Sequence, residues 1–243
     1  MSTTAEKWPT QLRLPGQTAA PEGPVDMTMM YVMHHAFRRD LARFAEAARQ
    51  TPVADRETWQ QLGWRWEVFA EALHHHHSGE DAGLWPWLLE HGTADDRETL
   101  EAMEAEHAEI DPLLSACAHG FRRLATHADK DARAALAVRL AATRDHLARH
   151  LQHEETGAIP ILQRLMTQAE WERLEEEHFS KDVSPRRLLV LVPWIADELP
   201  AEVIDKLLTD AGLPMRLIWL ATRRRYARRD RAAFRHVEAV RVA

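Results

Sequence analysis

Apolar positions recur along most of the chain at helical rather than strand spacing. Val and Ile are few, Asn-Gly turns are absent, and Ala, Leu, Glu and Arg dominate. This pattern predicts an all-α protein. Four long segments predict four helices, at Asp26–Gln50, Asp55–Leu89, Ala94–Ala128 and Lys130–Met166. Short connections between long helices favour antiparallel neighbours, so we expect an up-down-up-down four-helix bundle.

Gly and Pro residues mark the places where these helices are expected to weaken or bend. Glycine lowers helix stability, and proline removes a backbone donor and clashes with the preceding turn. The second helix should therefore weaken in its last turns, and the third and fourth should kink. The residues concerned are Gly79, Gly83, Pro86, Pro112 and Pro160.

Two further segments flank the predicted bundle of residues 26–166. Residues 1–25 are rich in Pro, Gly, Thr and Ala and lack periodicity, which predicts a flexible N-terminal arm. Residues 167–243 open with a capping box at Thr167–Glu170 and predict a C-terminal helical extension. Its helices are apolar on one side, so we expect them to cap the bundle or to form a homodimer face.

Composition and charge narrow the class of protein. With 38 acidic and 31 basic residues the formal net charge is −7, which argues against general nucleic-acid binding. Cys117 is the single cysteine, so no intramolecular disulfide forms and a reducing compartment is favoured. The first residues lack a secretory signal, and the longest apolar run, Leu188–Ala196, is too short to span a bilayer. We therefore expect a soluble cytoplasmic protein with no membrane partner.

The chain carries 15 histidines, and each predicted bundle helix has at least one with a polar partner about a turn away. Side chains four apart share one helix face, so these groups would meet in the bundle core, as in bundle di-metal sites. Imidazole with carboxylate suits iron, manganese or zinc. The first helix carries His34 and His35 in the run MHHAFRRDL, and the pairs on the other helices are His76 with Glu80, His107 with Asp111, and His150 with Glu154 and Glu155.

These motifs resemble the hemerythrin-like (HHE cation-binding) family. The marks are HHxxED followed by WP, EHxxI, and HLxxEE with a proline ten residues after the histidine, in order and one per helix. The run HHAFRRDL also resembles the opening segment of that family. The resemblance covers residues 26–166. It implies a four-helix bundle with a non-haem centre of two iron ions, manganese or zinc being less favoured, that reacts with dioxygen, peroxide or nitric oxide.

The resemblance also implies a ligand for each position. Glu80 would bridge the two metals, and Glu154 or Glu155 would be the second bridge. Four-residue spacing from His150 favours Glu154, whereas the five-residue spacing of oxygen-carrying hemerythrins favours Glu155. The histidine ligands implied are His34, His76, His107 and His150, with His75 or His77 lining the site and not binding directly.

One departure from the family pattern bears on function. Oxygen-carrying hemerythrins have HxxxH on the third helix, where this chain has His107 and Asp111. Either a carboxylate replaces an imidazole, or the metal loses a ligand and gains an open position. Both options favour a centre that binds and reduces dioxygen or peroxide. The alternatives are an oxidase or oxygenase acting on a small organic substrate, an iron or oxygen sensor signalling through its C-terminal helices, and a structural zinc or metal-free protein.

Overall fold

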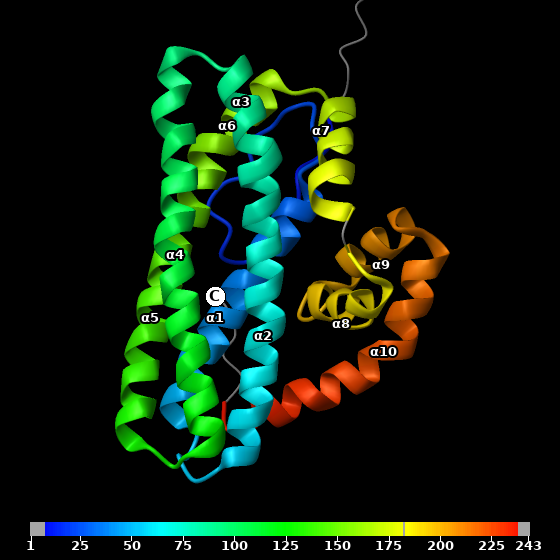
Figure 1. The fold of residues 1–243 in the computed structure, drawn as a ribbon. Helices are drawn as coiled ribbons and strands as arrows, with labels where there is room; N and C mark the ends of the chain where they lie inside the picture. The colour runs from blue at the N-terminus through cyan, green and yellow to red at the C-terminus, as the bar shows by residue number, and fades with distance from the viewer. Residues whose placement is uncertain (1–7, 182, 238–243) are drawn as a thin grey trace, which may run out of the picture.

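The computed structural model describes residues 8–181 and 183–237, and this part of the chain contains helices and no β-strand. Four long helices run side by side and form a bundle (Figure 1). Around it, α1 and α4 each pack against both α2 and α5. The predicted all-α bundle is confirmed. The four helices are α1 (Thr28–Gln50), α2 (Arg56–Gly79), α4 (Ala94–Thr126) and α5 (Lys130–His153).

Two of the long helices change their winding where the sequence predicted weak or bent turns. After α2 comes the π-helical segment η1 (Glu80–Leu84) and then α3 (Trp85–His91). After α5 comes η2 (Glu154–Ala158) and then α6 (Ile159–Leu165). In contrast, α4 runs through Pro112 without a change of helix type. Local π-helical turns are frequent at functional sites, so both segments draw attention to Glu80 and Glu154.

The apolar core of the bundle is divided into two clusters along the helix axes. On α1 one cluster ends at Tyr31 and the other begins at Ala36. On α4 the corresponding residues are Met103 and Ile110. The two clusters are separated in the same way on all four helices. Between them lies one layer of the bundle in which the buried residues are polar.

The N-terminal segment differs from the expected flexible arm in that residues 8–25 lie against the bundle. Leu14, Ala20 and Val25 are buried. The amide of Val25 donates to the Gln163 side chain, and the amide of Thr18 donates to Glu155 at 2.7 Å. Specific hydrogen bonds therefore hold residues 8–25 against the bundle, although the sequence of this segment shows no hydrophobic periodicity that would predict such packing. Residues 1–7 lie outside the described part of the chain.

The C-terminal extension follows one side of the bundle. It contains α7 (Gln168–Leu174), η3 (Glu175–Ser180), α8 (Pro185–Ile195), α9 (Ala201–Asp210) and α10 (Gly212–Ala233). Of these, η3, α8 and α10 contact α2, and the last turn of α10 returns toward the start of α2 (Figure 1). No helix among the described residues has the length and apolar character that crossing a membrane requires.

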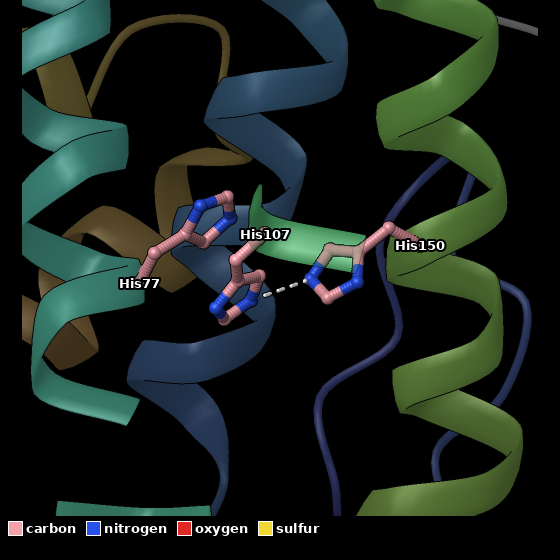
Figure 2. A group of neighbouring side chains, drawn as sticks. All are labelled: His77, His107 and His150. Atoms are coloured by element: carbon pink, nitrogen blue, oxygen red, sulfur yellow. Dashed lines mark hydrogen bonds between the residues drawn. The ribbon is translucent and has the colours of Figure 1, made fainter. Parts of the chain in front are cut away.

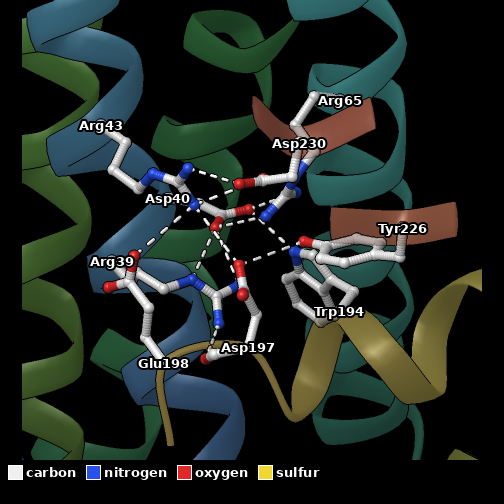
Figure 3. Close-up of polar contacts among 9 residues, drawn as sticks. All are labelled: Arg39, Asp40, Arg43, Arg65, Trp194, Asp197, Glu198, Tyr226 and Asp230. Carbon is white, nitrogen blue, oxygen red and sulfur yellow. Dashed lines mark hydrogen bonds and ion pairs between the residues drawn. The ribbon is translucent and has the colours of Figure 1, made fainter. Parts of the chain in front are cut away.

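A buried polar network attaches this extension to the bundle (Figure 3). Asp40 is fully buried and pairs with Arg39 at 2.8 Å and with Arg65 at 2.6 Å. The indole of Trp194 on α8 donates to Asp40 at 2.8 Å, and Arg65 also donates to Asp230 on α10. The network therefore joins α1, α2, α8 and α10 through polar side chains that are buried.

Candidate metal centre

Seven buried histidine and glutamate side chains meet in the polar layer between the two core clusters. They come from all four bundle helices and from both π-helical segments. They form two groups, and within each group one ligand atom per residue lies within 4.8 Å of the others. The three-histidine group is His77, His107 and His150, and the mixed group is His34, His76, Glu80 and Glu154.

The three-histidine group brings imidazoles from α2, α4 and α5 together (Figure 2). The Nε2 atoms of His107 and His150 lie 3.1 Å apart. The ring of His77 stacks on His107, with centroids 3.8 Å apart and planes 8° apart. Three imidazoles with converging nitrogens are a common arrangement of zinc and iron ligands.

The mixed group lies beside the three-histidine group, and its two carboxylates face both. Nε2 of His76 lies 3.2 Å from one oxygen of Glu80, whose other oxygen lies 3.5 Å from His107. Nε2 of His34 lies 3.1 Å from an oxygen of Glu154, and that oxygen lies 4.0 Å from His150. Each carboxylate thus lies within reach of histidines from both groups.

Most of the atoms that face this centre lack a hydrogen-bond partner. Buried polar atoms in proteins are nearly always satisfied, because leaving one unpaired costs about 1–3 kcal/mol. A cluster of unsatisfied buried atoms at one point therefore indicates a binding site for a group that accepts lone pairs, such as a metal cation. The unpartnered atoms are Nε2 of His34 and His76, both ring nitrogens of His77, and both carboxylate oxygens of Glu80 and Glu154.

Burial and neighbouring charges shift the pKa values of the groups in the centre. Burial, and then the neighbouring charge of Glu154, raise the pKa of Glu80 well above its usual value. Burial also opposes charge on Glu154, but His34 outweighs it and lowers the Glu154 pKa to about 2. Burial lowers the pKa values of His76 and His77 well below the usual value. Burial thus keeps Glu80, His76 and His77 neutral, and a bound cation would stabilise the ionised form of Glu80 beside Glu154.

Acidic residues outside the centre fix two of the histidines from behind. Nδ1–H of His107 donates to Asp81 at 2.7 Å. Nδ1–H of His150 donates to Glu106 at 2.8 Å, and Glu106 also accepts from the partly exposed His153. A proton held on Nδ1 leaves the lone pair on Nε2, which faces the centre. Such carboxylate–histidine pairs are typical of metal ligands.

Glu155 fixes the third histidine in the same way. Its Oε1 accepts from Nδ1 of His34 at 3.0 Å and from Arg38 at 2.7 Å. Its Oε2 accepts from the Thr18 amide. Burial opposes a charge on His34, but Glu154 and Glu155 outweigh it and raise the His34 pKa to about 9. These three donors engage both carboxylate oxygens of Glu155, so it orients His34 from outside the centre.

The structure brings six of the eight sequence-predicted ligands to the two groups and leaves two outside. Glu155 lies behind His34, as described above. Asp111 is exposed. On α4 the buried stripe passes from His107 to Ile110 and Leu114, a spacing of three and then four, which leaves position 111 on the solvent side. The six residues that meet are His34, His76, Glu80, His107, His150 and Glu154.

His77 was expected to line the site, and the structure places it inside the three-histidine group. Neighbouring residues on a helix point about 100° apart, so His76 and His77 cannot face one metal. They can face two adjacent groups, one each. The run of four histidines held this signal, but it required knowing that two groups lie side by side at that depth.

A repeated motif positions the two glutamates. Both π-helical segments follow the pattern H-x-x-x-E-x-x-G-x-x-P, with His76, Glu80 and Pro86 in the first copy and His150, Glu154 and Pro160 in the second. In each copy the glutamate is the first residue of the π-helical turn, and the proline lies at the start of the next α-helix. Proline has no backbone N–H to donate, and the wider π-helical turn accommodates this missing hydrogen bond. It also lets α2 and α5 present the same pair of ligands.

Comparison with known proteins agrees with this geometry. The hemerythrin HHE cation-binding domain family matches residues 26–162, which hold all seven residues of the two groups. No protein of curated function and no solved structure matches the chain. The match covers more than half of the chain and includes the complete bundle. The chain therefore belongs to the hemerythrin family of HHE cation-binding domains and is a metal-binding helical protein.

Proposed function

We propose that the chain holds two iron ions, one in each group, and binds or reduces dioxygen or peroxide there, with nitric oxide as a further ligand. Glu80 and Glu154 would be shared between the ions, because each lies within reach of histidines from both groups. The observation that carries this proposal is the set of unpartnered buried atoms described above.

The donor set favours iron over softer metals. Five imidazoles and two carboxylates surround the centre, and this mixture suits iron, with manganese or zinc less favoured. Cys117 contributes nothing, because it lies in the apolar cluster and hydrogen-bonds Thr143. Burial raises the pKa of that thiol to about 11, so it stays protonated. Chemistry that depends on thiolate ligands is thereby disfavoured.

When bound, iron supplies the electrons that binding or reducing an oxygen species needs. The chain supplies the surroundings. The outer carboxylates keep the histidine rings in place, and the two apolar clusters exclude water. Tyr31 is almost fully buried and its hydroxyl has no partner. Burial, and then the charges of Glu155 and Glu154, raise the Tyr31 pKa, so this hydroxyl keeps its proton and can donate it in a hydrogen bond.

A sensor is the second candidate, and one contact favours it. The ring of Phe37 lies 5.2 Å from His76 and 5.9 Å from Trp194, measured between centroids. Trp194 belongs to α8 and to the buried network. Packed side chains therefore connect the centre to the extension and can transmit a structural change at the centre to it. In this proposal residues 26–166 form the metal-binding bundle and 167–243 the output surface. A homodimer formed through exposed Leu213 and Leu217 of α10 would also allow the extension to signal the state of the centre.

Metal analysis with absorption spectroscopy tests the proposal. The untagged protein, loaded with ferrous iron without oxygen, should hold about two irons per chain and gain a near-ultraviolet charge-transfer band in air. Reversible spectral changes would favour a carrier or sensor, and irreversible oxidation an oxidase, peroxidase or oxygenase. Absence of iron binding, or stoichiometric zinc in its place, would contradict the proposal. The cytoplasmic location stays a prediction.

Variants locate the bound iron. His76→Ala and Glu80→Ala should each lose most of it, because each removes a donor from a centre that has no spare one. His146→Ala is the matched control, since His146 is partly exposed and pairs with Glu109 at 2.7 Å outside both groups. Full iron retention in both Ala variants of the centre would refute this ligand assignment.

A further inference from the structure

A cavity of about 160 Å³ lies against His76, between the bundle and the C-terminal extension. Apolar side chains form most of its wall, among them Met30, Met33, Trp171, Phe179 and Ile195. The part of the wall contributed by the extension lies beyond residues 26–162, the region that matches the family. The cavity is therefore a feature that this extension adds to the bundle.

The segment η3 covers the cavity at close range because two glycines let it approach. A Cβ atom on Gly79 would lie 2.8 Å from the ring of Phe179, and one on Gly83 would lie 2.5 Å from His178. Nε2–H of His75 donates to the carbonyl of Phe179 at 2.8 Å. Glycines four residues apart on one face thus form a seat for η3, and the hydrogen bond holds it there.

The wall of the cavity selects by charge and size. Glu175 lines it, and burial, together with the nearby charges of Asp26 and Glu172, raises the pKa of that carboxyl to about 7, so the wall disfavours anions. The volume is close to that of an enclosed engineered apolar cavity of about 150 Å³ that takes up xenon or benzene, and the present cavity differs from it in being partly open to solvent. Uncharged molecules no larger than one aromatic ring fit both conditions.

Phe179 connects the cover with the centre. Its ring centroid lies 6.2 Å from that of His76 and 6.1 Å from that of Trp171. His76 belongs to the mixed group, which offers two histidines where the other group offers three. A small molecule in the cavity would therefore lie beside the group with fewer imidazoles.

We propose that this cavity holds small uncharged apolar molecules of the size of dioxygen or nitric oxide beside His76, with η3 as its cover. The delivery of such a molecule to iron rests on the proposed function, whereas its binding in the cavity does not. The two parts are therefore tested separately.

Xenon, which is apolar and needs no metal, tests the binding. The metal-free protein under xenon pressure, observed by xenon diffraction or by ¹²⁹Xe NMR, should take up xenon in this cavity. Ala72→Phe fills the cavity from α2 and should abolish that uptake. Ala70→Phe is the matched control, because Ala70 lies on the same helix and does not line the cavity. Absence of xenon in the wild-type cavity, or unchanged uptake in Ala72→Phe, would overturn the proposal.

Opening the cover is a second test that does not depend on how Ala72→Phe folds. Phe179→Ala should enlarge the cavity and speed xenon exchange, while Trp219→Ala on α10 should leave exchange unchanged. In the iron-loaded protein, nitric oxide mixing should give a several-fold faster spectral change with Phe179→Ala than with wild type. Xenon uptake without iron binding would refute the di-iron proposal alone. Iron binding with equal nitric oxide rates in both proteins would refute the role of η3 as a cover.

Discussion

Adjacent side chains on one helix point in different directions, so His76 and His77 face different groups of candidate ligands. His76 faces the mixed group and His77 the three-histidine group. Because the family pattern names one histidine at this point, the sequence predicted one ligand from a run of four. The second became visible only when α4 and α5 placed His107 and His150 beside it.

The first prediction at this scale concerns His77. His77→Ala should lower the iron content by about one ion per chain, because the three-histidine group would keep only two imidazoles. His74→Ala is the matched control from the same run, since His74 is exposed. Metal analysis of both variants decides the matter, and an unchanged iron content in His77→Ala would return His77 to the role of a lining residue.

The choice between the two adjacent glutamates gives the second prediction. Glu154→Gln should lose most of the bound iron, because it removes the charge that faces both groups. Glu155→Gln should keep the ions but bind them about 10–100-fold more weakly, since it weakens the support of His34. Competition with a chelator of known affinity measures both. The reverse order of effects would favour the five-residue spacing of oxygen-carrying hemerythrins.

At the scale of helices, the sequence predicted where winding changes but not how. Gly83 and Pro86, and likewise Gly157 and Pro160, weaken an α-helix locally, and the structure turns both weak points into π-helical segments. Pro112 carries the same sequence signal without that outcome, because it is exposed on α4 and no buried ligand follows it. Packing of the glutamates against the histidines decides between a kink and a wider turn.

The third prediction concerns the start of α4. Asp96 closes a capping box with Thr93 and accepts from Arg164 of α6 at 2.6 Å. The hydrogen bond from Arg164, and then those from Thr93, lower the Asp96 pKa to about 2. A lowered folded-state pKa means that this stabilisation is present above the unfolded value and is lost as the pH falls through about 2.

Asp96→Asn should therefore lower the thermal midpoint at pH 6, and the difference from wild type should shrink between pH 4 and pH 2. Thermal unfolding followed by circular dichroism over that range measures it. Asp145→Asn, at an exposed pair with Arg144, is the control. A difference that stays constant down to pH 2 would show that the ionised carboxylate of Asp96 is not the source of the effect.

At the scale of the whole molecule, the apolar faces of residues 167–243 predicted helices that must be buried, but not against what. The answer depends on isolated polar residues far apart in the sequence, such as Asp40, Arg65 and Trp194, which no periodicity connects. For the same reason the covering of the cavity beside His76 by η3 could not be predicted. By contrast, the ordered histidine and glutamate motifs predicted the bundle and most of the residues that meet in it.

The fourth prediction tests this attachment. Burial opposes a charge on Asp40, but Arg65 and Arg39 outweigh it and lower its pKa. Asp40→Asn should destabilise the protein by about 3–5 kcal/mol, because it removes the carboxylate paired with buried Arg39 and leaves buried Arg65 with Asp230 alone. Urea unfolding measures the loss, and Asp145→Asn should cost only about 0–1 kcal/mol. A loss for Asp40→Asn as small as that of the control would show that the network does not hold the extension.

The most direct test of the di-iron centre is diffraction at the iron absorption edge from crystals of the iron-loaded protein. We predict two anomalous peaks per chain. One should lie among His77, His107 and His150 and the other between His34 and His76, with Glu80 and Glu154 touching both. A single peak, no peak, or a signal at the zinc edge alone would contradict a di-iron centre in this bundle.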